Sequence, residues 1–258
     1  MAGLAFALMA QTLQPANRRG PVTGTATGSR RKKFFLVDLY QTAVGKKYVM
    51  AITGIAMMGF VVAHMIGNLK MYLGREDIDA YGHALRTLLH PIMPNELVLW
   101  ILRLGLFAML VAHIHAAATL TIMNKKARPV GYQSPRQYVA VNFASKSMRY
   151  TGLIVFLYLI FHLLDLTIGT TNPDFVEGRV YDNLVASMSR PAVAIVYILC
   201  NIAIAVHLFH GIWSVFQSMG LNNPRYNVAR RWVAMALSGI ILVGNVSFPI
   251  MILAGVVH

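Results

Sequence analysis

The segment that decides the fold is residues 206–214, VHLFHGIWS, in which two histidines lie three positions apart in an otherwise apolar run. The run extends from about Pro191 to Met219, which is long enough to cross a bilayer as an α-helix. An imidazole is costly to bury in lipid unless it has a partner. His207 and His210 therefore predict a functional site inside a membrane.

Four more apolar runs of similar length accompany this one. Of the 258 residues, 57% are hydrophobic and only 12% are charged, which is not typical of a soluble globular protein. The additional spans are expected at residues 47–72, 96–124, 150–170 and 228–256. The sequence thus predicts an all-α fold, an integral membrane bundle of five transmembrane helices. The single cysteine excludes an internal disulfide framework and a zinc site of the CxxC type.

The connections between the runs carry weaker patterns. Residues 79–90 predict a short amphipathic helix that Pro91 ends, and residues 125–149 and 171–190 predict loops. Pro191 suits the first position of its helix. A kink is expected before Pro249 in the last span.

The charges alternate along the connections. Most Lys and Arg residues fall in segments 1–47, 125–149 and 220–231, whereas nearly all acids fall in segments 74–96 and 171–190. The positive-inside rule then predicts a multi-pass protein of the inner or plasma membrane, with the N-terminus cytoplasmic and the C-terminus outside. The net charge of +14 is explained by this placement, so nucleic-acid binding is excluded.

The N-terminal part differs from the rest. Residues 1–40 predict a basic cytoplasmic extension, and residues 41–258 a five-helix transmembrane redox anchor. Residues 29–33, SRRKK, suit either anionic lipid headgroups or plain solvation. No long soluble segment lies on either side, so the chain has no complete active site alone. Water-soluble chemistry is expected to come from partner subunits.

Histidines recur in the other spans at defined depths. With a rise of about 1.5 Å per residue, His64 and His162 lie toward the outer face, and His113 and His210 toward the inner face. We therefore predict two pairs, His64 with His162 and His113 with His210. Two bis-histidine sites stacked across a bilayer suit haem iron and offer a route for electrons.

A second histidine lies close in sequence to His210 and another close to His113. His207 shares a helical face with His210, so one can ligate while the other bonds a haem propionate, a quinone or a backbone carbonyl. His115 points to nearly the opposite face from His113, and we assign it no ligand role.

Asp165 is unusual as a carboxylate deep in a span. It follows His162 by one turn, and a charge at this depth is a functional candidate. It can orient His162, carry protons or ligate a metal. Arg103 is a possible partner.

Five segments carry a resemblance to a known family. Residues 44–54, 64–69, 113–132, 162–169 and 207–221 resemble, in order and spacing, motifs of the cytochrome b subunit of succinate dehydrogenase/fumarate reductase. The similarity is to its five-helix, single-subunit branch.

The resemblance implies an anchor of respiratory complex II, a succinate:quinone oxidoreductase that also serves the tricarboxylic acid cycle. Its partners would be a flavoprotein subunit and an iron–sulfur subunit, together with membrane lipid. Electrons from succinate would pass through flavin and iron–sulfur centres to a quinone, expected to be menaquinone. One or two b haems would lie in the anchor. By motif, His64 and His162 would ligate the outer haem, and His113 and His210 the inner.

One departure from the family pattern leaves alternatives open. Many relatives read HLLH where residues 162–165 read HLLD. The histidines can then hold a single haem, or a non-haem iron or iron–sulfur centre with Asp165, Cys200 or His207 as alternative ligands. A structural anchor without haem, with quinone reduced near the cytoplasmic face, is a further reading. A b-type cytochrome of a hydrogenase or formate dehydrogenase is another.

A quinone needs an apolar slot with a hydrogen-bond donor at each carbonyl. On the inner side the candidates are Ser147, Arg149, Trp213, Ser214 and Gln217. Each of them also fits a plain position at the solvated interface.

Overall fold

The computed structural model describes residues 35–127, 139–221 and 223–258. The chain divides into two compact units, residues 1–37 and residues 38–258. The α-helices are α2 (Phe35–Gln41), α3 (Ala43–Asn68), α4 (Arg75–Arg86), α5 (Leu97–Lys126), α6 (Val139–Leu163), α7 (Val180–Met188), α8 (Pro191–Ser218) and α9 (Asn227–Leu253). Three short turns extend them, the 3₁₀ helices η1 (Leu69–Leu73) and η3 (Pro224–Tyr226) and the π-helical η2 (Leu164–Ile168). The described residues contain no strand, which confirms the all-α prediction.

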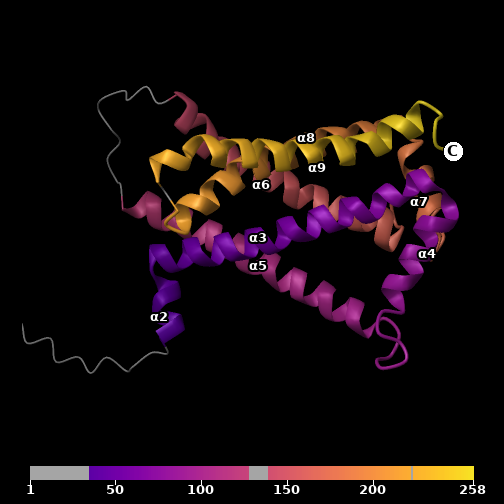
Figure 1. The fold of residues 1–258 in the computed structure, drawn as a ribbon, viewed down its shortest axis with the longest axis horizontal. Coiled ribbons are helices and arrows are strands. Elements are labelled where there is room, and N and C mark those ends of the chain that lie inside the picture. Colours follow the sequence, from indigo (N-terminus) through magenta and orange to yellow (C-terminus); the bar gives the residue numbers. More distant parts are fainter. Residues whose placement is uncertain (1–34, 128–138, 222) are drawn as a thin grey trace, which may run out of the picture. The chain divides into compact units, whose positions relative to one another are not determined.

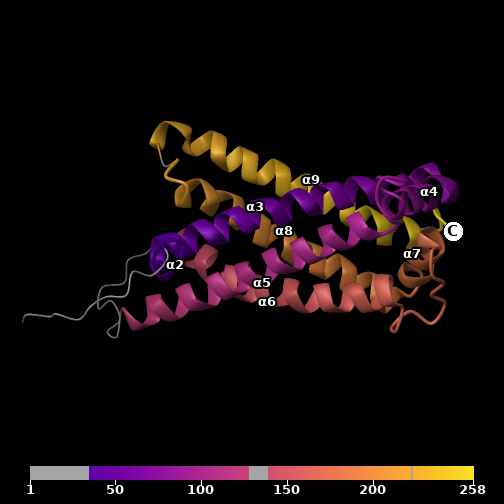
Figure 2. The same ribbon diagram turned by 90° about the horizontal axis from the view of Figure 1, so that it is seen from below.

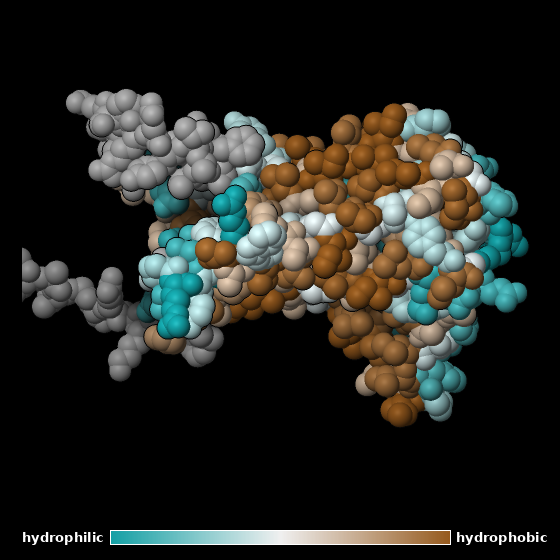
Figure 3. Space-filling view, turned by 45° about the horizontal axis from the view of Figure 1, so that its top comes forward, coloured by the Kyte–Doolittle hydropathy of each residue, from teal (hydrophilic) through white to brown (hydrophobic). Residues whose placement is uncertain are grey.

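Among the described residues, five helices are long and apolar enough to cross a membrane, as predicted. They are Ala43–Leu73, Leu97–Lys126, Ser147–Ile168, Pro191–Ser218 and Pro224–Leu253. Figure 3 shows apolar side chains over the middle of one face and polar side chains toward its ends. This distribution is the one that a protein surrounded by hydrocarbon requires.

The five spans run lengthwise, and their neighbours are defined (Figures 1 and 2). Helix α3 packs against α5, and α6 packs against α8. Helix α8 also contacts α3 and α9, so it joins the two helix pairs. The short helices α4 and α7 pack on each other at the end where α3 finishes.

The predicted boundaries of α4 are wrong by about one turn. The helix occupies Arg75–Arg86 rather than residues 79–90. Glu76 and Asp77 lie in its first turn, where carboxylates interact favourably with the helix dipole. Burial of Ile78 against the core fixes this earlier start.

Two segments predicted as loops are partly helical. In residues 125–149, α5 continues to Lys126 and α6 begins at Val139. In residues 171–190, α7 forms because Tyr181, Leu184 and Met188 are buried on one face against the core. Sequence periodicity over nine residues is too short to show this. The remaining predictions for residues 1–34, including the basic segment 29–33, and for residues 128–138 lie outside the described residues.

The start of α3 depends on a glycine. Thr42 is the N-cap, and its side-chain oxygen accepts a hydrogen bond from the backbone N–H of Gly45 at 2.9 Å. A Cβ atom at Gly45 would overlap the backbone carbonyl of Leu39. Only glycine permits this close approach of the chain to the first turn.

We predict that Gly45→Ala destabilises the protein by about 1–3 kcal/mol, the usual effect of overpacking a site whose neighbour is backbone. Gly59→Ala in the same helix is the matched control, because no atom lies within 4 Å of a Cβ placed there. It should leave stability unchanged or raise it by about 0.5–1 kcal/mol. Thermal unfolding of both variants in detergent measures the difference. Equal midpoints would contradict the assigned contact.

Candidate functional site

His64 of α3 and His162 of α6 lie together toward the end of the bundle at which α3 finishes (the outer end; the opposite end is the inner end). Their ring centroids are 5.9 Å apart, and the rings meet edge to face at 89°. The ring of Phe60 stacks on His64 at 5.4 Å. The side-chain amide nitrogen of Asn68 is 3.3 Å from Nε2 of His64.

The His162 ring is enclosed by aromatic side chains. Tyr158 lies 5.7 Å and Tyr197 6.0 Å from it, centroid to centroid. Its Nδ1 atom is buried and has no hydrogen-bond partner among the described residues. Buried polar atoms normally have a partner, so this nitrogen marks a position where a ligand is expected.

The inner level contains His113 of α5 and His207 of α8. Nδ1 of His113 is 3.1 Å from the hydroxyl of Thr53, and Nδ1 of His207 is 3.3 Å from the hydroxyl of Thr151. His113 therefore contacts a threonine of α3, and His207 contacts a threonine of α6.

The glycine after each threonine gives the imidazole room. A Cβ atom at Gly54 would be 3.4 Å from Cε1 of His113, and one at Gly152 would be 3.4 Å from Cε1 of His207. The edge of each ring formed by Nδ1 and Cε1 therefore faces the Thr-Gly step of the neighbouring helix.

The two levels are equally far apart on α3 and α6. Thr53 precedes His64 by eleven residues, and Thr151 precedes His162 by eleven residues. Eleven residues make about three turns, so each Thr and its His project from the same face, roughly 16 Å apart along the axis. The same interval in both spans therefore separates the threonine contacts of His113 and His207 from the contact between His64 and His162.

His210 and His115 lie in different surroundings. His210 is half-buried, and its ring is 5.1 Å from that of Phe209. No hydrogen bond to His210 is found within residues 35–127, 139–221 and 223–258. Nδ1 of His115 is 2.5 Å from the hydroxyl of Tyr40, and the two rings stack at 5.8 Å.

Asp165 is fully buried in the π-helical turn η2, where four side chains donate to it. Its Oδ1 accepts from Arg190 Nη2 at 2.6 Å and from the Thr171 hydroxyl at 3.3 Å. Its Oδ2 accepts from the Tyr197 hydroxyl at 2.9 Å and from the Ser187 hydroxyl. With both oxygens occupied, Asp165 is a paired structural anion.

The prediction that Arg103 pairs with Asp165 is wrong. The guanidinium of Arg103 lies over the Trp100 ring at 5.0 Å, one turn earlier in its own helix. Arg190 reaches Asp165 from the N-terminus of α8, because α7 folds the intervening segment back over the end of the bundle. Sequence spacing alone does not show that α7 brings Arg190 back to Asp165.

A metal centre held only by protein side chains is not formed in the part of the chain that the structure describes. No group of three or more His, Cys, Asp or Glu residues gathers there. Residues 1–34, 128–138 and 222 contain none of these residue types. Cys200 is free and half-buried, and Asp165 is fully hydrogen-bonded.

The quinone candidates gather where α6 begins and α8 ends. Arg149 and Gln217 are exposed, and Ser147, Trp213 and Ser214 are half-buried. The Arg230 guanidinium lies over the Trp213 ring at 5.3 Å. Although Arg230 is buried, it was not singled out in the sequence, where it reads as one of several loop cations.

Arg230 closes the turn after α8. Its Nη1 donates to the carbonyl of Leu221 at 2.6 Å, and its Nη2 to the carbonyl of Asn223 at 3.4 Å. It also bonds the side chain of Asn227. Buried Arg230 therefore stabilises the turn that follows α8, beside Trp213 of the candidate quinone region.

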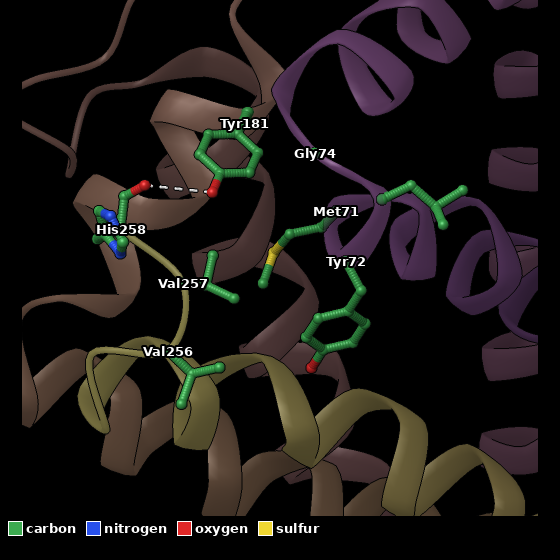
Figure 4. Close-up of a pocket in the computed structure, with 8 residues that line it drawn as sticks. Met71, Tyr72, Gly74, Tyr181, Val256, Val257 and His258 are labelled. Carbon is green, nitrogen blue, oxygen red and sulfur yellow. Dashed lines mark hydrogen bonds between the residues drawn. The ribbon is translucent and has the colours of Figure 1, made fainter.

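A separate hollow of about 290 Å³ opens at the outer end, between η1, α7 and the C-terminal residues (Figure 4). The Tyr181 hydroxyl donates to the carbonyl of His258 at 3.2 Å across it. It is lined by Met71, Tyr72, Leu73, Gly74, Tyr181, Val256, Val257 and His258. None of the predicted site residues lines this hollow.

The contacts of Asp165 predict a large effect of removing its partner. We expect Arg190→Met to destabilise the protein by about 3–5 kcal/mol, because it leaves a buried carboxylate without a counter-charge. Arg179→Met is the matched control, since Arg179 is exposed and 3.9 Å from Asp182, and should cost less than about 1 kcal/mol. The double variant Asp165→Asn, Arg190→Met should recover part of the loss. Thermal unfolding in detergent measures all three, and additive effects would contradict the pairing.

One family model matches part of the chain. Residues 140–230 match that of the succinate dehydrogenase/fumarate reductase transmembrane subunit. The matched third of the chain includes His162, His207, His210 and all five quinone candidates. No curated protein and no solved structure matches the chain. Over this third the chain is similar to that transmembrane subunit, and its five apolar spans fit a multi-pass membrane protein.

Proposed function

We propose that this chain is the single, five-helix anchor of a succinate:quinone oxidoreductase, and that it passes electrons from an iron–sulfur subunit to quinone through two b haems. The observation that carries the proposal is the contact between the rings of His64 and His162. At the other level, His113 and His207 each lie beside a threonine of a neighbouring span. A bundle that only held soluble subunits would not need paired imidazoles in its apolar interior.

The outer pair, His64 and His162, would hold one haem iron. Their ring centroids are 5.9 Å apart, close enough for both imidazoles to reach one metal ion. The four acceptor contacts of Asp165 and the position of Tyr197 against His162 orient this ring.

For the inner haem, we propose His113 with His207 in place of the sequence-based pair His113 with His210. His207 has the same environment as His113, a Thr-Gly step of a neighbouring span, whereas His210 lies beside Phe209. His210 then remains a candidate for a propionate or quinone contact.

Bound haem supplies reversible one-electron chemistry at each level. The protein supplies imidazole ligands and apolar helices that exclude water from the centres. The absence of any group of three potential metal ligands in the described ranges favours haem over a non-haem iron centre, because a porphyrin brings its equatorial ligands with it.

The quinone, which we infer to be menaquinone, would bind on the inner side near Trp213 and Ser214. The flavoprotein and iron–sulfur subunits would dock on the same side, where Lys and Arg residues gather. Electrons from succinate would then reach the inner centre first. The N-terminus would be cytoplasmic and the C-terminus outside.

The histidine assignment predicts which variants lose which spectral component. In the purified three-subunit complex, His64→Ala and His162→Ala should remove one of two b-type components from the reduced-minus-oxidised spectrum. His113→Ala and His207→Ala should remove the other and abolish quinone reduction, while succinate oxidation by a soluble dye persists. His115→Ala is the control and should keep both components. A wild-type complex without a b-type band would refute the haem proposal, and quinone reduction retained in His113→Ala would favour a structural anchor.

The orientation is tested by labelling single cysteines in intact cells. In a Cys200→Ser background, a membrane-impermeant maleimide should label Asp174→Cys from outside and Lys126→Cys only after lysis, because positively charged connections stay in the cytoplasm. The reverse pattern would place the chain, and its partner subunits, the other way round.

A further inference from the structure

We propose that Thr53 and Thr151 are positioning residues that fix the tautomer of His113 and His207, so that Nε2 of each ring carries the lone pair that binds iron. The inference deepens the proposed function and rests on it. It also explains, through geometry on two separate helices, why His207 is the inner partner of His113.

The argument begins with the single proton of the Thr53 hydroxyl. Oγ1 of Thr53 is 2.7 Å from the carbonyl oxygen of Val49, one turn earlier in α3. A carbonyl only accepts, so the hydroxyl proton is donated there. What remains on Oγ1 for any other neighbour is a lone pair.

The neighbour at that lone pair is His113. Its Nδ1 is 3.1 Å from Oγ1, so the contact forms only if Nδ1 carries hydrogen and donates it. A charged imidazolium is costly within an apolar span, and the neutral ring has one N–H. With the hydrogen on Nδ1, Nε2 is left with a free lone pair, the form that binds a metal.

The same proton count holds at Thr151. Its Oγ1 is 2.8 Å from the carbonyl of Ser147, so the proton is again donated within its own helix. Nδ1 of His207 is 3.3 Å from this oxygen and must donate to it. His113 and His207 therefore share one tautomer, although they lie on different helices and donate to threonines of different spans.

A threonine without a histidine neighbour shows that a hydrogen bond from the hydroxyl to its own helix does not by itself make a positioning residue. Thr121 of α5 donates to the carbonyl of Ala117 at 2.8 Å in the same way. No histidine contact to Thr121 is found among the described residues. Thr53 and Thr151 differ from it in being followed by Gly54 and Gly152, which let a ring approach the helix. Thr121 thus serves as a matched control.

The threonine contact also affects the bound iron. An Nδ1–H that donates to an oxygen makes the imidazole a stronger base at Nε2 and fixes the ring orientation. Such outer contacts are commonly worth about 10–100-fold in metal affinity. A more basic ligand stabilises ferric iron, so loss of the contact should raise the midpoint potential of the inner centre.

The test uses Thr53→Val, Thr151→Val and the control Thr121→Val in the purified complex. Valine keeps the shape of threonine and removes the hydroxyl. We expect the first two variants to lose inner haem about 10–100-fold more readily and to raise the midpoint potential of what remains. Thr53→Ser and Thr151→Ser should restore wild-type potentials, because they restore the acceptor. Thr121→Val should match wild type.

An unchanged inner potential and haem content in both Thr→Val variants would overturn the inference, as would an equal effect of Thr121→Val. Histidine ¹⁵N shifts of the labelled complex provide a readout independent of haem. We expect His113 and His207 protonated at Nδ1 in wild type and mixed tautomers in the valine variants. A wild-type complex that lacks haem yet shows these tautomers would refute the proposed function while supporting the positioning role. Protonation at Nε2 in wild type would refute the positioning role.

Discussion

The need to satisfy imidazole nitrogens inside hydrocarbon governs the rest of this structure. Each polar atom in a span requires a partner there, since water is absent. The described side chains meet the requirement at one depth and leave it partly unmet at the other. At the inner level, threonine hydroxyls accept from Nδ1 of His113 and His207. At the outer level, aromatic rings surround His162 and leave a ring nitrogen unpartnered. Helix α8 contacts both α6 and α3, which brings the histidine-bearing spans within reach of one another.

The outer end is stabilised by charge, whereas the inner sites depend on neutral hydrogen bonds. Asp165 and Arg190 join η2 to the start of α8, and Tyr197 extends this network to the His162 ring. The network therefore combines two tasks, closing the end of the bundle and orienting an outer histidine. At the opposite end Arg230 closes the turn that joins α8 to α9. Half-buried Arg190 and buried Arg230 thus fix the two ends of the segment that carries His207.

Length and hydropathy were sufficient to predict five spans, and counting residues along them was sufficient to predict that His64 and His162 are neighbours. Contacts that depend on the tertiary fold could not be predicted from the sequence. Arg190 and Asp165 are 25 residues apart, and only the fold of α7 makes them neighbours. The choice between His207 and His210 depends on which face of α8 meets Thr151, and two positions on one helical face cannot be separated from sequence. One sequence pattern could have indicated the second level, namely the Thr-Gly step that precedes both His64 and His162 by the same interval.

That shared interval sets a limit on insertions and deletions. One residue added between Gly54 and His64 would turn the histidine by about 100° around the α3 axis and move it away from His162. The same holds between Gly152 and His162 in α6. Connections at the membrane surface can change length without altering either level. Insertions and deletions are therefore expected to fall outside the two eleven-residue intervals. These intervals set the distance between the inner and outer centres.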